Sequence, residues 1–258
     1  MKAPQIPENE SDRLLALNSY QILDTLDEEE YDSITKVASE ICQTPITVIS
    51  LVDKDRQWFK SKVGLEASET AREISFCGHA INSPNDIFIV SDARKDERFH
   101  DNPLVEGNPN IVFYAGVPLV DEDGFALGTL CAIDSKPRTL TENQLAALKV
   151  LSKKAVALLT LKKKKMQLEQ EKKFLFDAIS FSSPFFMILS REKKIMVFGE
   201  NYKKCLPELK PGDSFEEHFS WETSVDLENI FEENKIPQKL IFFAAKKGSL
   251  RFKCSLPK

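Results

Sequence analysis

Two neighbouring segments, residues 111–120 and 125–133, are apolar on both alternating faces and restrict the fold more than any other feature. They are joined by Asp121-Glu122-Asp123-Gly124, a polar linker of the kind found in hairpin turns. Strands that are apolar on both sides lie inside a sheet that is covered on both faces. We therefore predict an antiparallel hairpin with helices on one face and the loops and helical turns of residues 66–112 on the other.

Other segments extend this sheet and supply its helices. Residues 46–52 are rich in β-branched side chains and predict a strand that pairs, through a polar turn, with residues 57–63. A short strand is expected at residues 87–90. Residues 8–20, with Ser11 or Asp12 as the cap, and residues 27–41 carry apolar side chains at helical spacing. The pattern predicts an α+β fold.

The connections on the second face are polar or rich in turn residues. Residues 66–73 predict a loop or a short helix, and residues 93–99 predict a helical turn. Residues 101–110 contain Pro103, Gly107 and Pro109, which predict an ordered loop.

The pattern changes after Pro137, because no glycine or proline follows until Pro184. With Thr139 or Thr141 as its cap, this segment predicts a single helix of about 35 to 40 residues. Several leucines fit a coiled-coil spacing, but Lys165 and Lys172 fall at seam positions in that frame. A coiled coil and a solvated connecting helix are therefore both open interpretations.

Composition limits the classes of protein that fit. With 258 residues, 42% of them apolar and 29% charged, the chain is long enough for two globular domains. A net charge of −5 disfavours nucleic acid as a partner. No run approaches the roughly 18 apolar residues of a membrane span, and the N-terminus lacks a signal peptide, so we expect a cytoplasmic protein. The five scattered cysteines predict reduced thiols.

The C-terminal part reads as a second α+β unit. Residues 184–198 predict two strands around a charged turn, with helical pieces at residues 202–206 and 226–233. Further strands are expected at residues 239–245 and 249–256. Because such a domain would leave two sheet edges open, we expect the chain to be a fragment or its second domain to be short.

Residues with chemical potential are few. Cys77 and His79 would share one side of a strand but not of a helix, and the favoured interpretation is that Cys77 packs while His79 bonds a backbone group. With three histidines at unsuitable spacing, we expect no metal site. Phosphate-binding glycine loops are absent. The run Lys162-Lys163-Lys164-Lys165 is interpreted as a solvated linker.

Several ordered motifs together resemble the GAF domains of bacterial sensor kinases and of cyclic-nucleotide or cyclic-dinucleotide enzymes. The motifs are Arg13-Leu14-Leu15-Ala16-Leu17, Leu23-Asp24-Thr25, Phe76-Cys77-Gly78-His79-Ala80-Ile81, Asp92-Ala93, Asp96-Glu97-Arg98-Phe99, Asn102-Pro103-Leu104-Val105, Phe113-Tyr114-Ala115-Gly116-Val117-Pro118-Leu119 and Gly128-Thr129-Leu130-Cys131-Ala132-Ile133-Asp134. The resemblance implies a central antiparallel sheet, terminal helices that pair with a second copy, and a small-molecule pocket on the opposite face.

The resemblance names no ligand or cofactor, but it suggests which residues form the pocket wall. The candidates are Phe76, Cys77, His79, Asp92, Phe99, Tyr114 and Cys131. A bilin-attaching Cys-His dipeptide is absent, since Gly78 separates Cys77 from His79. GAF-type free methionine sulfoxide reductases are similar around Cys77, yet no resolving cysteine lies between Cys77 and Cys131. No residue is therefore assigned as catalytic.

The segment from about residue 181 resembles a PAS-like module of the kind beside haem domains that sense nitric oxide. The matching runs are Ser183-Pro184-Phe185-Phe186-Met187-Ile188-Leu189, Ile195-Met196-Val197-Phe198-Gly199 and Leu206-Pro207-Glu208-Leu209-Lys210-Pro211-Gly212. We expect a GAF domain at residues 1–160, a helical linker at 161–180 and an incomplete PAS-like domain at 181–258.

Together these features predict a sensory module of a signalling protein. It would bind a small ligand or a partner, form a homodimer through its terminal and linker helices, and control an output kinase, cyclase or other domain outside this chain. A reductase that uses Cys77 and a ligand-free dimerisation scaffold are the alternatives.

Overall fold

The computed structural model describes residues 1–182, 186–189, 194–199, 207–214 and 241–244. The chain divides into two compact units, Met1–Met166 and Gln167–Lys258. The predicted elements at residues 202–206, 226–233 and 249–256 lie outside the described residues. Within the described part, no helix combines the length and apolar content that crossing a membrane requires.

A six-stranded antiparallel sheet forms the centre of the first unit. Its spatial order is β3-β2-β1-β6-β5-β4. The strands are β1 (Ile46–Val52), β2 (Arg56–Val63), β3 (Glu69–Ala71), β4 (Phe88–Val90), β5 (Phe113–Val120) and β6 (Ala126–Asp134). The predicted hairpin is present as β5 and β6, and every residue of β6 is buried. Both strands are interior strands, as their two-sided apolar pattern requires.

The middle of the sheet depends on one glycine. Gly128 of β6 pairs with Leu51 of β1, where the two backbones approach closely. A Cβ atom on Gly128 would lie 1.9 Å from the carbonyl oxygen of Ser50. Only glycine permits this approach, so the pairing of β1 with β6 requires it.

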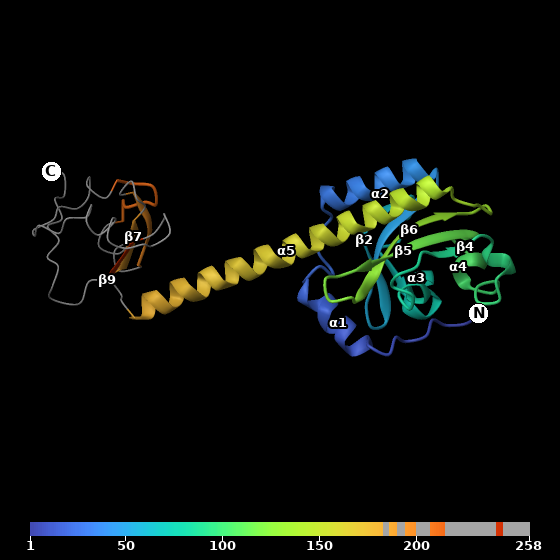
Figure 1. Ribbon diagram of the computed structural model, residues 1–258, viewed down its shortest axis with the longest axis horizontal. Coiled ribbons are helices and arrows are strands. Elements are labelled where there is room, and N and C mark those ends of the chain that lie inside the picture. Colours follow the sequence, from blue (N-terminus) through green and yellow to red (C-terminus); the bar gives the residue numbers. More distant parts are fainter. Residues whose placement is uncertain (183–185, 190–193, 200–206, 215–240, 245–258) are drawn as a thin grey trace, which may run out of the picture. The chain divides into compact units, whose positions relative to one another are not determined.

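Helices cover one face of the sheet (Figure 1). They are α2 (Glu29–Cys42) and the first part of α5 (Glu142–Ser182), and α1 (Glu10–Ser19) contacts β6. Leu130 and Ala132 of β6 point into this helix-covered core, which Leu148 of α5 completes. Burial of one apolar stripe per helix explains why the helices form where the spacing of three and four occurs.

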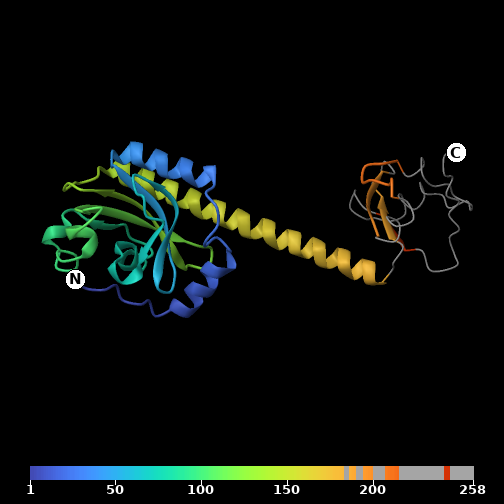
Figure 2. The same ribbon diagram turned by 180° about the vertical axis from the view of Figure 1, so that it is seen from behind.

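Short helices and loops cover the other face, as Figure 2 shows from behind. These elements are α3 (Phe76–Ala80), α4 (Pro103–Glu106) and the 3-10 turns η1 (Arg72–Ile74) and η2 (Ala93–Lys95). Cys131 and Ile133 of β6 point into this second core. Successive side chains of β6 therefore point alternately into the two cores, because side chains along a strand alternate between the faces of the sheet.

Three local predictions differ from the structure. Helix α1 begins at Glu10 with Asn9 at its N-cap, so Ser11 and Asp12 lie inside the helix. Residues 66–73 contain strand β3, whose Ala71 pairs with Arg56 of β2, a partner that local propensity does not reveal. Residues 101–110 contain helix α4, which begins where the side chain of Asn102 accepts a hydrogen bond from the Leu104 amide.

Helix α5 begins with a reciprocal cap and has 41 residues. The Gln144 amide donates to Thr141 Oγ1 over 3.3 Å, and the Thr141 amide donates to Gln144 Oε1 over 2.9 Å. This is a capping box, which defines the start of the helix at the sequence level. Of the two predicted caps, Thr141 is the one used.

The lysine run on α5 is not simply solvated, which corrects the interpretation from sequence. Lys162 Nζ lies 2.7 Å from Glu28 Oε1, and Lys164 Nζ lies 3.1 Å from Glu122 Oε1. The ammonium of Lys163 sits 4.7 Å from the ring centroid of Tyr20. Consecutive residues on a helix point in different directions, so the three lysines reach three separate elements of the first unit.

The described part of the second unit contains a three-stranded antiparallel sheet in the order β8-β7-β9. The strands are β7 (Phe186–Leu189), β8 (Ile195–Phe198) and β9 (Ile241–Ala244). An isolated bridge joins Lys194 to Ser214. The strands predicted within residues 184–198 and 239–245 are thus present.

Candidate functional site

A cavity of about 330 Å³ lies between the sheet and the loops of its second face. Strands β1, β2, β5 and β6 provide one wall, and α3, α4 and the connecting loops provide the other. Its lining residues are Ile46, Val48, Gln57, Phe59, Gly64, Leu65, Glu66, Ala67, Thr70, Phe76, Cys77, Leu104, Asn108, Pro109, Ile111, Tyr114, Cys131 and Ile133. A cavity of this size, mainly apolar with a few polar groups, is typical of small-molecule sites.

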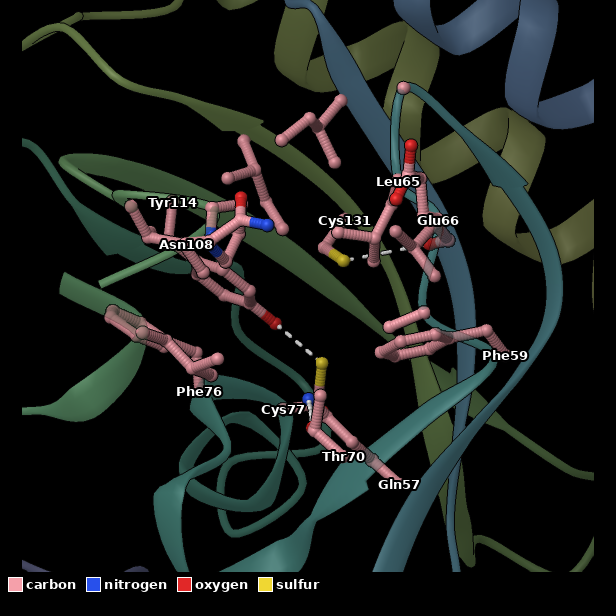
Figure 3. A pocket seen from close by; sticks show the side chains of 18 residues that line it. Gln57, Phe59, Leu65, Glu66, Thr70, Phe76, Cys77, Asn108, Tyr114 and Cys131 are labelled. Carbon is pink, nitrogen blue, oxygen red and sulfur yellow. Dashed lines mark hydrogen bonds between the residues drawn. The ribbon is translucent and has the colours of Figure 1, made fainter.

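The cavity has a polar mouth and a buried interior. Glu66, Ala67 and Asn108 are exposed and belong to the loops after β2 and α4. Cys77, Tyr114 and Cys131 are buried, at 3%, 1% and 1% exposure. Figure 3 shows the Tyr114 hydroxyl directed at the sulfur of Cys77. Any bound molecule would therefore enter past polar loops and reach two thiols and a phenol.

Tyr114 is held so that its hydroxyl reaches Cys77. The hydroxyl donates to Cys77 Sγ over 3.4 Å and lies 3.4 Å from Thr129 Oγ1. Its ring extends over Gly116, two residues further along the same face of β5, where a Cβ atom would lie 2.3 Å from the hydroxyl oxygen. The absent side chain of Gly116 thus provides the space for this contact.

Cys77 is positioned by a short capped helix. Ser75 Oγ accepts a hydrogen bond from the Gly78 amide over 3.0 Å and donates to the Arg72 carbonyl over 2.6 Å. Gly78 also lies under Pro4 of the N-terminal segment, since a Cβ atom there would be 2.8 Å from the proline ring. These contacts fix the orientation of α3 and direct Cys77 toward the sheet.

The thiols of Cys77 and Cys131 belong to the same cluster of hydrogen-bonded side chains. Burial opposes ionisation of Cys77, but hydrogen bonds with Cys131, Thr129 and Tyr114 outweigh it and lower the pKa of this thiol. The same contact with Cys77, together with burial, raises the pKa of Cys131. Burial also raises the pKa of Tyr114, which therefore keeps its proton and remains a donor. Of the two thiols, Cys77 is therefore the one whose surroundings favour the thiolate.

Four of the seven predicted pocket residues line this cavity, namely Phe76, Cys77, Tyr114 and Cys131. The other three do not. Phe99 stacks behind Phe76 with ring centroids 4.0 Å apart, and His79 meets Phe99 edge-on at 4.9 Å. Asp92 lies at the surface, where Arg94 Nε donates to its Oδ1 over 2.9 Å.

The three outer residues have structural partners of their own. His79 Nε2 lies 3.1 Å from the Lys2 carbonyl, and burial lowers the pKa of the imidazole. Asp92 caps η2 by accepting from the Arg94 amide. The structural interpretation of His79 thus fits its observed contact.

Most of the lining was not found from sequence. Ile46, Val48, Gln57 and Phe59 come from β1 and β2, and the mouth residues come from loops. The alternation within β1 and β2 signals which residues share a face, but only the position of the covering loops decides which face remains open.

Charged groups are scarce around the cavity. Among its lining residues Glu66 is the one carboxylate, and none is lysine, arginine or histidine. In the part of the chain that the structure describes, no group of three or more histidine, cysteine, aspartate or glutamate side chains is arranged to hold a metal ion.

A profile of the GAF domain family matches residues 28–158, which include both walls of the cavity. The chain belongs to the GAF domain family. The cavity described above is therefore the interior of the GAF domain, and α5 is the helix that extends from it. GAF domains are sensory and regulatory modules.

A relative from Pseudomonas aeruginosa, the cyclic di-GMP phosphodiesterase PA2567, is 40% identical over 158 residues. The match covers 61% of this chain and 27% of the relative, so the chain spans about a quarter of the length of that protein.

Two solved GAF domains are also similar. The domain of an Acinetobacter phosphoenolpyruvate-protein phosphotransferase aligns at 18% identity with a TM-score of 0.43, covering 59% of this chain and 93% of that one. The PixJ domain of Thermosynechococcus elongatus aligns at 19% identity with a TM-score of 0.45, covering 58% and 92%.

Proposed function

We propose that this chain is the sensory input part of a signalling protein, in which a small molecule binds the GAF cavity and helix α5 passes the change to an output domain. The observation that carries the proposal is the cavity itself, which lies on the face of the sheet opposite α5. A ligand in the cavity would contact one face of these strands, and α5 packs on the other face. The strands therefore connect the ligand site to the output helix.

Strand β2 offers a direct connection between the two faces. Phe59 lines the cavity, and the next residue, Lys60, points to the other face and is buried. Lys60 Nζ lies 2.6 Å from Glu28 Oε1, which also holds Lys162 of α5. A ligand that binds one arrangement of β2 more tightly would shift the contacts of α5 by that difference in affinity.

The output is proposed to be enzymatic and to lie outside this chain. The similarity to a cyclic di-GMP phosphodiesterase supports an output that acts on cyclic dinucleotides, and a kinase or a cyclase is the alternative. The chain itself would be regulatory, located in the cytoplasm. Residues 181–258 would form a PAS-like domain between input and output, a proposal supported by the antiparallel sheet of β7, β8 and β9.

A homodimer through α5 is part of this proposal. Leu161, Leu168 and Leu175 are exposed and recur every seven residues, which is the repeat of a coiled coil. Light scattering of the full chain and of a form truncated after Leu159 tests this role. We expect a dimer for the full chain and a monomer after truncation, and a dimer that survives truncation would remove α5 as the main contact.

Native mass spectrometry of the protein purified from its host tests the sensor proposal. We expect a retained small molecule that is lost when Ala67 at the mouth is changed to Trp. Protein that carries no adduct and binds nothing in a small-molecule screen would instead favour a ligand-free scaffold.

The adjacency of two thiols supports a second candidate, a thiol-dependent reductase. The sequence shows no cysteine between Cys77 and Cys131, but the fold brings these two residues to the same cavity. Free methionine sulfoxide assayed with a dithiol reductant decides it. Turnover that is lost in Cys77→Ser would establish the activity, and no turnover by the unmutated protein would end it.

A further inference from the structure

The charges around the GAF cavity restrict what it can bind. We infer that the cavity takes an uncharged, mainly apolar molecule and excludes anionic ligands, including nucleotides that carry phosphodiesters. This inference rests on the proposed sensor function and names the chemical class of its ligand. Under it, the domain reports on a molecule unrelated to the cyclic dinucleotide chemistry proposed for the output.

The lining provides no cation for an anion. A phosphate or carboxylate that leaves water needs charged or strongly polar donors in return. None of the 18 lining residues is lysine, arginine or histidine, and Glu66 at the mouth repels negative charge. Lys62 lies beside the mouth, but its ammonium donates to the carbonyl oxygens of Glu66 and Ala67, the latter over 2.8 Å. This lysine stabilises the loop.

One backbone donor at the start of each short helix beside the cavity is also occupied. Two short helices, α3 and α4, begin next to it, and free amides at such positions could contact an anion. At α3 the Gly78 amide donates to Ser75 Oγ over 3.0 Å. At α4 the Leu104 amide donates to Asn102 Oδ1 over 2.8 Å. The protein's own side chains thus accept the hydrogen bonds of these two amides, which are not available to an anion.

The remaining surface favours an apolar ligand with few polar groups. Val48, Phe59, Ile111 and Ile133 form apolar walls on either side of the cavity. The polar pair within the lining is already bonded, because Gln57 Nε2 donates to Thr70 Oγ1 over 2.6 Å. The amide of Asn108 at the mouth provides a polar contact for one end of the ligand. A volume of about 330 Å³ suits a small ring system.

A pair of probes that differ only in charge tests this inference. We would measure binding of 1-naphthalenemethanol and of 1-naphthoate to the full chain by isothermal titration calorimetry at pH 7.5, with cyclic di-GMP as a third probe. The neutral alcohol is expected to bind at least about tenfold more tightly than the carboxylate, because only the carboxylate loses its hydration without a partner. Cyclic di-GMP is expected not to bind.

Variants at the mouth locate the binding and change its selectivity. Ala67 is exposed and lines the cavity, so Ala67→Trp should block the mouth and weaken binding of the alcohol at least about fivefold without disturbing the core. Ala71→Trp is the matched control, since Ala71 is an exposed alanine of β3 outside the lining. Ala67→Arg adds a cation at the same position and should raise the affinity for naphthoate relative to the affinity for the alcohol.

The outcomes separate this inference from the function on which it rests. Naphthoate that binds as tightly as the alcohol, or cyclic di-GMP binding that Ala67→Trp abolishes, would overturn the ligand class and leave the sensor function standing. If none of the three probes binds but the purified protein retains a small molecule, the ligand class fails and the sensor function stands. If no molecule is retained either, both fail. Alcohol binding that is equally weakened by Ala71→Trp would place the site elsewhere and overturn the inference.

Discussion

The two faces of the GAF sheet use the same strands for opposite purposes. On the helix-covered face, Leu130, Ala132 and Leu148 are buried in a continuous core. On the loop-covered face, Cys131 and Ile133 from the same strand line an open cavity. Long helices can lay whole apolar stripes on a sheet, whereas short helices and loops cover it only in places. The type of covering element, more than the strands, decides where a cavity forms.

Charge is also distributed differently between the faces. The helix-covered side encloses the buried ammonium of Lys60, which pairs with the half-buried Glu28, while the cavity lining contains no cation. Buried charges persist only where they are paired. The ion pair thus holds the helices to one face of the sheet, whereas the cavity on the other face can bind and release a small molecule.

Matched truncations on β6 give the largest expected effect. Leu130→Ala on the helix-covered face should cost about 4 kcal/mol of unfolding free energy, and Ile133→Ala on the cavity face about 2 kcal/mol. The second value is smaller because Ile133 already borders open space on one side. Urea unfolding monitored by circular dichroism measures both. Equal costs would mean that the cavity face is packed as tightly as the other.

The ion pair between Lys60 and Glu28 gives an intermediate effect that depends on pH. Burial opposes ionisation of Glu28, but hydrogen bonds from Lys162 and Lys60 outweigh it and lower the pKa of this carboxyl. Glu28→Gln should cost about 1 to 2 kcal/mol at pH 7, because it removes the counterion of the buried Lys60, while the partial exposure of Glu28 and the bonds of Lys60 to Thr25 and Leu26 limit the loss. Because the pKa of Glu28 is lower in the folded protein, its ionised form stabilises the fold at pH values above the ordinary pKa of a glutamate. This stabilisation is lost as the pH falls through the pKa of Glu28 in the folded protein.

The cost of Glu28→Gln should therefore shrink in urea titrations below about pH 4.5, the ordinary pKa of a glutamate. Lys60→Met is the control, since an apolar side chain of similar length should change stability by less than about 1.5 kcal/mol. A cost of Glu28→Gln that is the same at pH 7 and pH 3.5 would contradict the charge explanation.

The thiol of Cys77 gives the smallest effect and reports on the cavity face alone. Tyr114→Phe removes one hydrogen bond to the thiolate and should raise the pKa of Cys77 by about one unit. The rate of alkylation by iodoacetamide, followed against pH by mass spectrometry, measures this shift. Tyr20→Phe on the helix-covered face is the control and should leave the profile unchanged. A profile that does not move in Tyr114→Phe would remove the phenol as the donor.

Sequence periodicity predicted the strands and helices of the first unit well where the signal is local. The two-sided apolar pattern of residues 111–133 located β5 and β6, and Thr141 marked the start of α5. Strand β3 was missed because its only support is pairing with β2, a long-range contact. Helix α4 was missed because Pro103 reads as a loop residue, although proline suits the first turn of a helix.

The cavity lining was predicted only in part, because it depends on long-range contacts that the local sequence pattern does not reveal. Phe76, Cys77, Tyr114 and Cys131 lie in motifs that carry the family resemblance, so they could be named. Phe99 and His79 also lie in these motifs, but Phe99 stacks behind Phe76 and His79 meets Phe99 edge-on, so neither lines the cavity. Neither spacing nor composition distinguishes a wall from the layer behind it, because that difference depends on how the loops fold over the sheet.

The three lysine contacts near the end of the first unit have a mechanical consequence for α5. Successive side chains on an α-helix are separated by about 100° around its axis, so Lys162, Lys163 and Lys164 hold it from directions that span about 200°. Their partners Glu28, Tyr20 and Glu122 belong to three different segments of the chain. Rotation of α5 about its own axis would break at least one of these contacts. The side chains of α5 beyond the GAF domain therefore point in directions that the domain fixes.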